Sequence, residues 1–390
     1  MGLLGVCFGD VLAIDTPKAQ SGEEYNWAQT LWHEIAHVTA VGVSDHKVPR
    51  WFTEGLSVYE EMLARPQWKR KMDLHLYSAL DKGKLLRFRD INQGFTRPEF
   101  PGQVILTYYQ SARWIEFISA QFGFEAIIDL LIAFKENRTL DEAFKSVLKT
   151  DLDDLEKTLF EKLQAERNQY DTVMKDLPPL MTFGEEEDIE LLRQKAQISN
   201  PYFSRVYDGF NRLQQDNYTD AERLFQGAIE LFPNYAQSPS PYEGLAAVYR
   251  KQNDMAKLKH TLTRYLTVSE YGAPQARELA DIFLAEGDTR QAIFYLNQSL
   301  EVAPYDIDAR SKLAKLFREQ NELDKEIAER QAILALNPVD KSTAFYELAL
   351  SLYNSGQKTA AKQHTLRSLD LAPGFREAQK LLLKCVEARN

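Results

Sequence analysis

The stretch LWHEIAHVTA, residues 31–40, carries two histidines four positions apart and a glutamate beside the first of them. Side chains four residues apart share one face of a helix, so His33 and His37 can reach one metal ion. Glu34 lies about 100° round the helix from His33, which places it near such an ion without making it a ligand. This His-Glu-x-x-His pattern is short and arises by chance on half-exposed helices, so the surrounding sequence decides its meaning.

The sequence around the histidines predicts a helix. Ser21 and Glu24 have the spacing of a capping box, which marks a helix start. The apolar residues that follow recur at steps of four, four and three and form one stripe, on a different face from the histidines: Trp27, Leu31, Ile35 and Val38.

A catalytic zinc ion needs a third protein ligand and an open fourth position. The stretch VPRWFTEGLSVYEE, residues 48–61, begins a second predicted helix, and Glu54 lies in its first turn, seventeen positions after His37. Packing of the two helices against each other would point Glu54 at the metal. The other nearby candidates are expected to be solvated helix carboxylates or loop residues: Glu60, Glu61, Asp45 and His46.

His-Glu-x-x-His followed by Trp-Phe-Thr-Glu-Gly resembles the gluzincin metallopeptidases, in particular the aminopeptidase-N-like and peptidase MA-like families, over about residues 5–165. The resemblance implies a Zn²⁺ cofactor with His33, His37 and Glu54 as ligands and Glu34 as general base. The gap between the two motifs is shorter than in the aminopeptidases, which favours the MA-like branch. The implied chemistry is the attack of a metal-activated water molecule on a peptide carbonyl.

A tyrosine opens the helix expected in TYYQSARWIEFISAQFG, residues 107–123. In the aminopeptidase-like enzymes a tyrosine at a similar place hydrogen-bonds the oxyanion, and Tyr108 matches that place best, with its neighbour Tyr109 as the alternative. A phenol can donate a hydrogen bond to the negative charge that develops on the scissile carbonyl oxygen. The competing interpretation is that both tyrosines are packing residues.

The N-terminal segment MGLLGVCFGDVLAIDTP, residues 1–17, predicts a small β element with Gly9-Asp10 as its turn. It has no basic start and carries an early acid, so it is not a signal peptide. The β element is too short for a complete sheet. Either later strands complete the sheet or an upstream part of the domain is missing, and we favour the second interpretation. The compartment is left open, since an upstream segment would permit an extracytoplasmic, periplasmic location.

One departure from the aminopeptidase pattern concerns the end of the substrate. In those enzymes a glutamate on the strand before the zinc helix binds the free amine of the substrate, and here Phe8 lies at that place. An aromatic ring cannot supply the same ion pair, so the sequence favours an endopeptidase.

The second half of the chain has a period of 34 residues. Pro304, Pro338 and Pro373 follow amphipathic stretches at intervals of 34 and 35 residues, and Pro233 precedes them by 71, or two periods. This is the period of tetratricopeptide repeats. Small residues recur at the expected helix crossings, and Gly287 and Gly356 at the turns within repeats. The predicted units are 202–238, 239–272, 273–306, 307–340 and 341–374, with a capping helix at 375–390.

These segments predict a mainly α protein in three parts. Residues 1–170 form a helical zincin-type domain with the small, incomplete β element, and residues 171–200 a linker and lead-in helix, with an acidic, proline-containing stretch at 176–190. Residues 201–390 form an α-solenoid of tetratricopeptide repeats, which would bind a substrate or a partner protein. An irregular helical bundle would not keep this register over five units.

Composition narrows the function classes. A net charge of -10 argues against nucleic-acid binding, which needs a basic surface. The sequence contains no run of eighteen apolar residues, so it predicts no transmembrane segment. Cys7 and Cys385 are too far apart in sequence to indicate a disulfide framework or a thiolate zinc site. The sequence therefore favours a zinc-dependent peptidase that binds peptide or protein, with a catalytically silent interaction scaffold as the alternative.

Overall fold

The computed structural model describes residues 5–8, 11–17, 25–72, 74–100, 102–174 and 200–387. Within these ranges the chain is mainly helical and has one two-stranded antiparallel sheet, which confirms the predicted fold class. Strand β1 (Gly5–Phe8) pairs with β2 (Val11–Ile14), and the register joins Gly5 to Ile14 and Phe8 to Val11. The predicted hairpin is therefore present, although its turn at residues 9–10 lies outside the described ranges.

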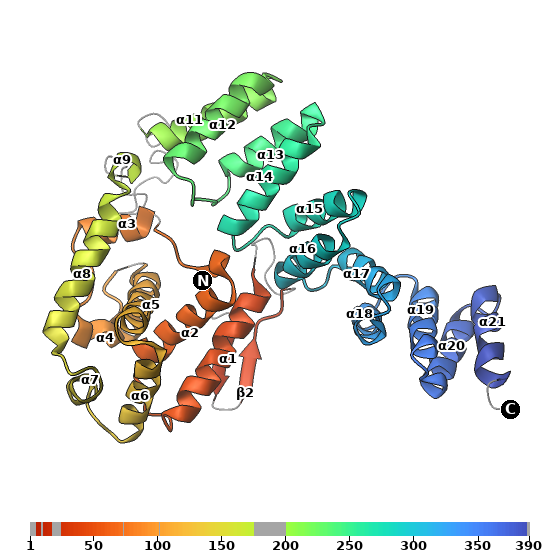
Figure 1. Cartoon of the computed structure of the whole chain (residues 1–390), viewed down its shortest axis with the longest axis horizontal. Coiled ribbons are helices and arrows are strands. Elements are labelled where there is room, and N and C mark those ends of the chain that lie inside the picture. Colours follow the sequence, from red (N-terminus) through yellow and green to blue (C-terminus); the bar gives the residue numbers. More distant parts are fainter. Residues whose placement is uncertain are drawn as a thin grey trace. The chain divides into compact units, whose positions relative to one another are not determined.

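The chain forms two compact units, Met1–Glu270 and Tyr271–Asn390. In the first unit the hairpin is followed by a set of helices of unequal length (Figure 1). Up to residue 174 they are α1 (Trp27–Val43), α2 (Arg50–Ala64), η1 (Pro66–Trp68), α3 (Leu74–Asp81), η2 (Phe88–Asp90), α4 (Ile91–Thr96), α5 (Gln103–Phe122), α6 (Phe124–Lys135), α7 (Leu140–Leu148), α8 (Leu152–Asn168) and α9 (Asp171–Met174).

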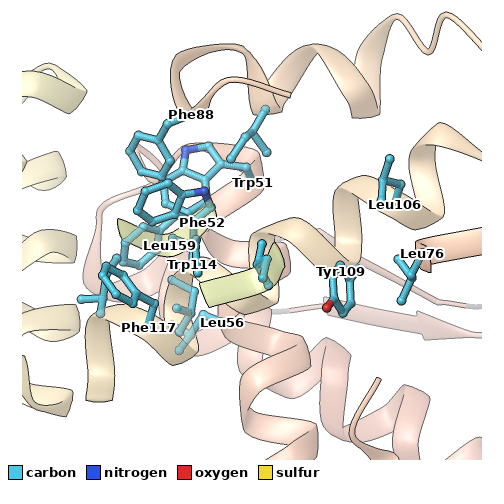
Figure 2. Packing of buried hydrophobic residues seen from close by; sticks show 14 of the residues in the cluster. Trp51, Phe52, Leu56, Leu76, Phe88, Leu106, Tyr109, Trp114, Phe117 and Leu159 are labelled. Carbon is cyan, nitrogen blue, oxygen red and sulfur yellow. The ribbon is translucent and has the colours of Figure 1, made fainter. Parts of the chain in front are cut away.

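The core of the first unit forms around α2 and α5. Aromatic and aliphatic side chains from these two helices, η2 and α8 pack together (Figure 2): Trp51, Phe52, Leu56, Phe88, Trp114, Phe117 and Leu159. Gly55 allows the close approach of the helices, because a Cβ at this position would lie 2.5 Å from the carbonyl oxygen of Ser111 on α5. The glycine of Trp-Phe-Thr-Glu-Gly thus fixes where α2, and Glu54 with it, lies over the core.

The C-terminal part of the chain consists of paired helices with the predicted period. The pairs are α11 (Pro201–Gln214) with α12 (Tyr218–Leu231), α13 (Pro241–Gln252) with α14 (Met255–Val268), α15 (Ala273–Ala285) with α16 (Thr289–Val302), α17 (Ile307–Glu319) with α18 (Leu323–Ala335), and α19 (Lys341–Asn354) with α20 (Lys358–Leu371). Helix α21 (Arg376–Glu387) follows the last pair, at the place predicted for the capping helix.

Two features explain why these pairs repeat. Small residues lie at the helix crossings, where Ala280, Ala314 and Ala349 are fully buried. The turns within the pairs each contain a residue with positive φ, which only glycine, asparagine and aspartate adopt readily. These residues are Asp216, Asn253, Gly287, Asn321 and Gly356. The sequence had indicated only the two glycines.

The first pair of repeat helices belongs to the core of the first unit. Tyr202 and Val206 of α11 and Ala228 of α12 are buried in the same hydrophobic cluster as Trp51 and Trp114. The linker predicted at residues 176–190 lies outside the described ranges, and the predicted boundaries at 170 and 200 stay predictions. Among the described residues, one hydrophobic cluster contains side chains from both sides of that stretch, from Met174 and from Tyr202.

No single helix in the described part of the chain is both long and apolar enough to cross a membrane. Helices α5 and α6 meet that criterion only when taken together, across a bend of 116°.

Candidate metal centre and active site

Helix α1 carries the two histidines and begins later than the sequence predicted. Its N-cap is Asn26, whose side chain accepts a hydrogen bond from the backbone N–H of Gln29. The amide nitrogen of Asn26 also donates to the carbonyl oxygen of Glu270 at 2.6 Å. Asn26 therefore caps the helix and anchors it within the first unit. The predicted capping box at Ser21 and Glu24 lies outside the described residues.

The face of α1 that packs into the protein is the polar one. Glu34 and His37 are buried, whereas Ile35 is 47% exposed and Trp32 is 45% exposed. Because α1 packs against the polar side of α2, the stripe of Trp27, Leu31, Ile35 and Val38 is not the buried face. Burial of ionisable groups costs free energy unless they are paired or bind a cation, so this orientation needs a compensating interaction.

Three ligand atoms from α1 and α2 converge on one point. The Nε2 atoms of His33 and His37 are 3.1 Å apart, and Oε2 of Glu54 lies 3.3 Å from the first and 3.2 Å from the second. Ligand atoms at about 2.0–2.1 Å from a tetrahedral zinc ion lie roughly 3.3 Å from one another. The residues fit a zinc ion in both type and spacing.

The outer atoms of the three residues are held by neighbours. Nδ1 of His33 lies 2.5 Å from Oε1 of Glu61, and Nδ1 of His37 lies 2.7 Å from the hydroxyl of Thr53. A carboxylate only accepts hydrogen bonds, so Nδ1 of His33 is the donor, and its Nε2 is left as the ligand atom. Arg50 donates from Nε to Oε1 of Glu54 at 3.2 Å, which leaves Oε2 directed at the histidines.

Glu61 was missed by the sequence analysis. It was expected to be solvated, but it is only 2% exposed, and it also accepts a hydrogen bond from the side chain of Gln29 at 2.6 Å. The signal was present, because Glu61 follows Glu54 by seven residues, or two helical turns, and so shares its face. Glu60 is half-buried, and Asp45 and His46 lie after the end of α1, as expected for loop residues.

The ionisation of the site shows that it favours positive charge. Burial alone would lower the pKa of His33, but hydrogen bonds with Glu54 and Glu61 outweigh it and raise the pKa to about 9. Burial alone would raise the pKa of Glu54, yet its hydrogen bonds with His33 and His37 hold that pKa well below its usual range. Glu54 and Glu61 therefore favour a positive charge on the neighbouring imidazole of His33.

Glu34 differs from Glu54 and Glu61 in its hydrogen bonding. Its Oε2 atom is buried without a hydrogen-bond partner among the described residues, and the side chain is 5% exposed. Burial raises the pKa of Glu34, against the opposing influence of His33 and His37. A buried carboxylate with a free oxygen beside a metal centre is suited to accept a proton.

The two candidate tyrosines of α5 point to different surroundings. The ring of Tyr108 lies 6.2 Å from that of His33 and packs edge-on against Phe95 at 5.0 Å. Burial and the nearby Glu54 raise the pKa of Tyr108 to about 12, against Arg50 and Arg70. Tyr109 instead lies in the core (Figure 2), where burial raises its pKa. The structure thus brings Tyr108 to the site and leaves Tyr109 outside it.

Two segments of the chain match known protein families. Residues 5–165 match the peptidase MA superfamily, and residues 278–306 match a tetratricopeptide repeat. The first match spans the hairpin, α1, α2 and α5, and therefore every residue placed at the site above.

Several solved structures are similar to part of this chain. They include YrrB, described as a tetratricopeptide repeat protein with an unusual peptide-binding site, at 17% identity and a TM-score of 0.36, covering 48% of this chain and 96% of YrrB. A MamA fragment from Desulfovibrio magneticus RS-1 matches at 14% identity and a TM-score of 0.32, covering 46% of this chain and 98% of the fragment. No curated protein sequence matches this chain.

Proposed function

We propose that this protein is a zinc-dependent peptidase that cleaves internal peptide bonds. The observation that carries the proposal is the convergence of His33, His37 and Glu54, whose ligand atoms lie 3.1–3.3 Å apart on the buried faces of α1 and α2. The match of residues 5–165 to the peptidase MA superfamily supports it independently.

In this proposal His33, His37 and Glu54 hold Zn²⁺, and Glu61 and Thr53 orient the two imidazoles through their Nδ1 atoms. The ion, when bound, would supply Lewis acidity toward a water molecule and the substrate carbonyl. Glu54 lies on α2, which Gly55 lets pack closely against α5, so the fold fixes the position of this ligand before a metal binds.

The remaining chemistry belongs to side chains. Glu34 is the general base, because its free Oε2 can accept the proton of the attacking water and pass it to the leaving amine. Tyr108 would donate its hydroxyl hydrogen to the carbonyl oxygen of the substrate as negative charge develops there. Its pKa of about 12 keeps the phenol protonated at neutral pH, as a donor requires.

We infer cleavage of internal bonds because β1 has no carboxylate at residue 8. Residue 8, at the place where the aminopeptidases carry an amine-binding glutamate, is phenylalanine. A substrate ammonium brought there would lose hydration without gaining an ion pair. We therefore expect no preference for substrates with a free N-terminus.

The repeat helices complete the proposal as a binding region. We assign residues 1–170 to the peptidase domain, residues 171–200 to the linker and lead-in helix and residues 201–390 to a repeat array that recruits a protein substrate or partner. The alternative is a scaffold in which the array binds a partner and the N-terminal domain does no chemistry.

Glu34→Gln separates these functions. Gln keeps the size of the side chain and removes its basicity, so this variant should bind Zn²⁺ like the wild type and hydrolyse a pool of internally quenched peptides about 10²–10⁴-fold more slowly. Glu60→Gln, which changes a half-buried carboxylate outside the site, is the matched control and should keep wild-type rates. No hydrolysis by the wild type, with zinc bound, would favour the scaffold, and equal measurable rates for wild type and Glu34→Gln would show that Glu34 is not the base.

A further inference from the structure

Gly5 of the hairpin lies next to the side chain of Glu34. A Cβ built on Gly5 would lie 2.6 Å from Oε1, 2.9 Å from Cδ and 2.8 Å from Cγ of Glu34. Real Cβ atoms essentially never approach other atoms so closely, and ordinary contact begins at about 3.4 Å. Strand β1 thus lies directly against the carboxylate, at a distance that only glycine permits.

This contact matters because no hydrogen bond holds the Glu34 carboxylate among the residues that the structure describes. Glu54 is held by Arg50 at 3.2 Å, and Glu61 by Gln29 at 2.6 Å, whereas Oε2 of Glu34 has no partner among the described residues. Packing of α1 against β1, which brings Gly5 beside Glu34, therefore helps to place the carboxylate. The position of Glu34 depends on what residue 5 is.

We propose that Gly5 is a positioning residue, whose missing side chain sets where the Glu34 carboxylate lies. This inference rests on the proposed function, because Glu34 is the general base there. In this proposal the hairpin packs against α1, and the backbone of β1 at Gly5 also limits where the Glu34 carboxylate can lie.

A side chain at residue 5 should lower the rate of hydrolysis and leave the free energy of unfolding nearly unchanged. Gly5 pairs with Ile14 in an antiparallel strand, a conformation that alanine adopts readily. Two of the three atoms that a Cβ would meet, Oε1 and Cδ, belong to the far end of a flexible side chain, which can move aside at small cost. Glu34 would have to move by at least 0.8 Å, the difference between 2.6 and 3.4 Å. A misplacement of about 1 Å at a reacting group can reduce a rate about a hundredfold.

The test compares Gly5→Ala with Gly42→Ala. Gly42 lies on the same helix as Glu34, and a Cβ there meets nothing within 4 Å, so its replacement is a matched control. In crystal structures of the metal-free proteins, Gly5→Ala should displace the Glu34 carboxylate by about 1 Å and Gly42→Ala should not. Zinc stoichiometry should be the same in all three proteins. In peptide hydrolysis Gly5→Ala should lower kcat about a hundredfold with little change in KM.

Combining Gly5→Ala with a substitution of Glu34 tests whether the loss of kcat acts through Glu34. Glu34→Asp withdraws the carboxylate by one methylene, so Gly5→Ala added to Glu34→Asp should cost less than about threefold in kcat, a strong departure from additivity. An unmoved carboxylate in the Gly5→Ala crystal structure would overturn the inference, and so would equal losses in both backgrounds. Absence of hydrolysis by the wild type would refute the proposed function, while the crystal structures would still decide the role of Gly5.

Discussion

Helices α1 and α15 each pack against the helix that follows them, but they bury opposite kinds of side chain. The buried residues of α15 are small or apolar, among them Ala276, Leu279 and Ala280. The buried residues of α1 are Glu34, His37 and Ala40. Apolar burial in α15 stabilises the fold by itself, at roughly 25 cal/mol per Å² removed from water. Polar burial in α1 does not, so its reason lies in the chemistry of the site.

The side chains that α1 exposes lead to the same conclusion. Helix α1 leaves Trp32 and Ile35 about half exposed while it turns its ionisable residues inward. A helix oriented only by the hydrophobic effect would take the opposite orientation. In α1 the matching partners on α2, Glu54 and Glu61, decide the orientation instead.

The largest expected effect outside the ligands concerns the buried carboxylate that orients His33. Glu61→Gln keeps the shape of the side chain and removes its charge, so the imidazole becomes a weaker ligand. Zinc affinity, measured by competition with a chelator, should fall about 10–100-fold. Its neighbour Glu60 is half-buried and outside the site, so Glu60→Gln should leave the affinity unchanged. Equal affinities for the two variants would show that the buried hydrogen bond to His33 does not support metal binding.

A smaller effect is expected from the repeat side of the comparison. Ala280 is fully buried at a helix crossing of α15, and Ala285 is exposed on the same helix. Ala280→Leu should lower the free energy of unfolding by about 1–3 kcal/mol through overpacking. Zinc binding should not change, since every proposed ligand lies in the first unit. Chemical denaturation followed by circular dichroism provides the measurement. If Ala285→Leu destabilises the protein as much, the crossing is not the constraint described here.

The smallest expected effect concerns the free end of the substrate. Matched peptides with acetylated and free N-termini should be hydrolysed with kcat/KM values within about tenfold of each other, because residue 8 offers no carboxylate to the amine. A preference for the free form of a hundredfold, roughly 2.7 kcal/mol in the transition state, would contradict the endopeptidase assignment. It would also require an acidic group elsewhere at the site.

Local patterns predicted most of this architecture. The 34-residue period located the repeat pairs, because each pair uses the same small residues and turns, and the two motifs brought His33, His37 and Glu54 together as expected. The burial of Glu61 and the exposure of Ile35 were not predicted. Both depend on how α1 and α2 face each other, and a periodic stripe read from one helix contains no information about its partner. The contact of Gly5 with Glu34 also needed coordinates, since it joins segments 29 positions apart.

The zinc content of the purified protein tests the central claim most directly. After reconstitution and removal of loosely bound metal, elemental analysis should find about one Zn²⁺ per folded chain. His37→Ala, which removes one of the three converging ligand atoms, should bind almost none under the same conditions. Folded wild-type protein without zinc would contradict the account, and so would a His37→Ala variant that retains a full equivalent.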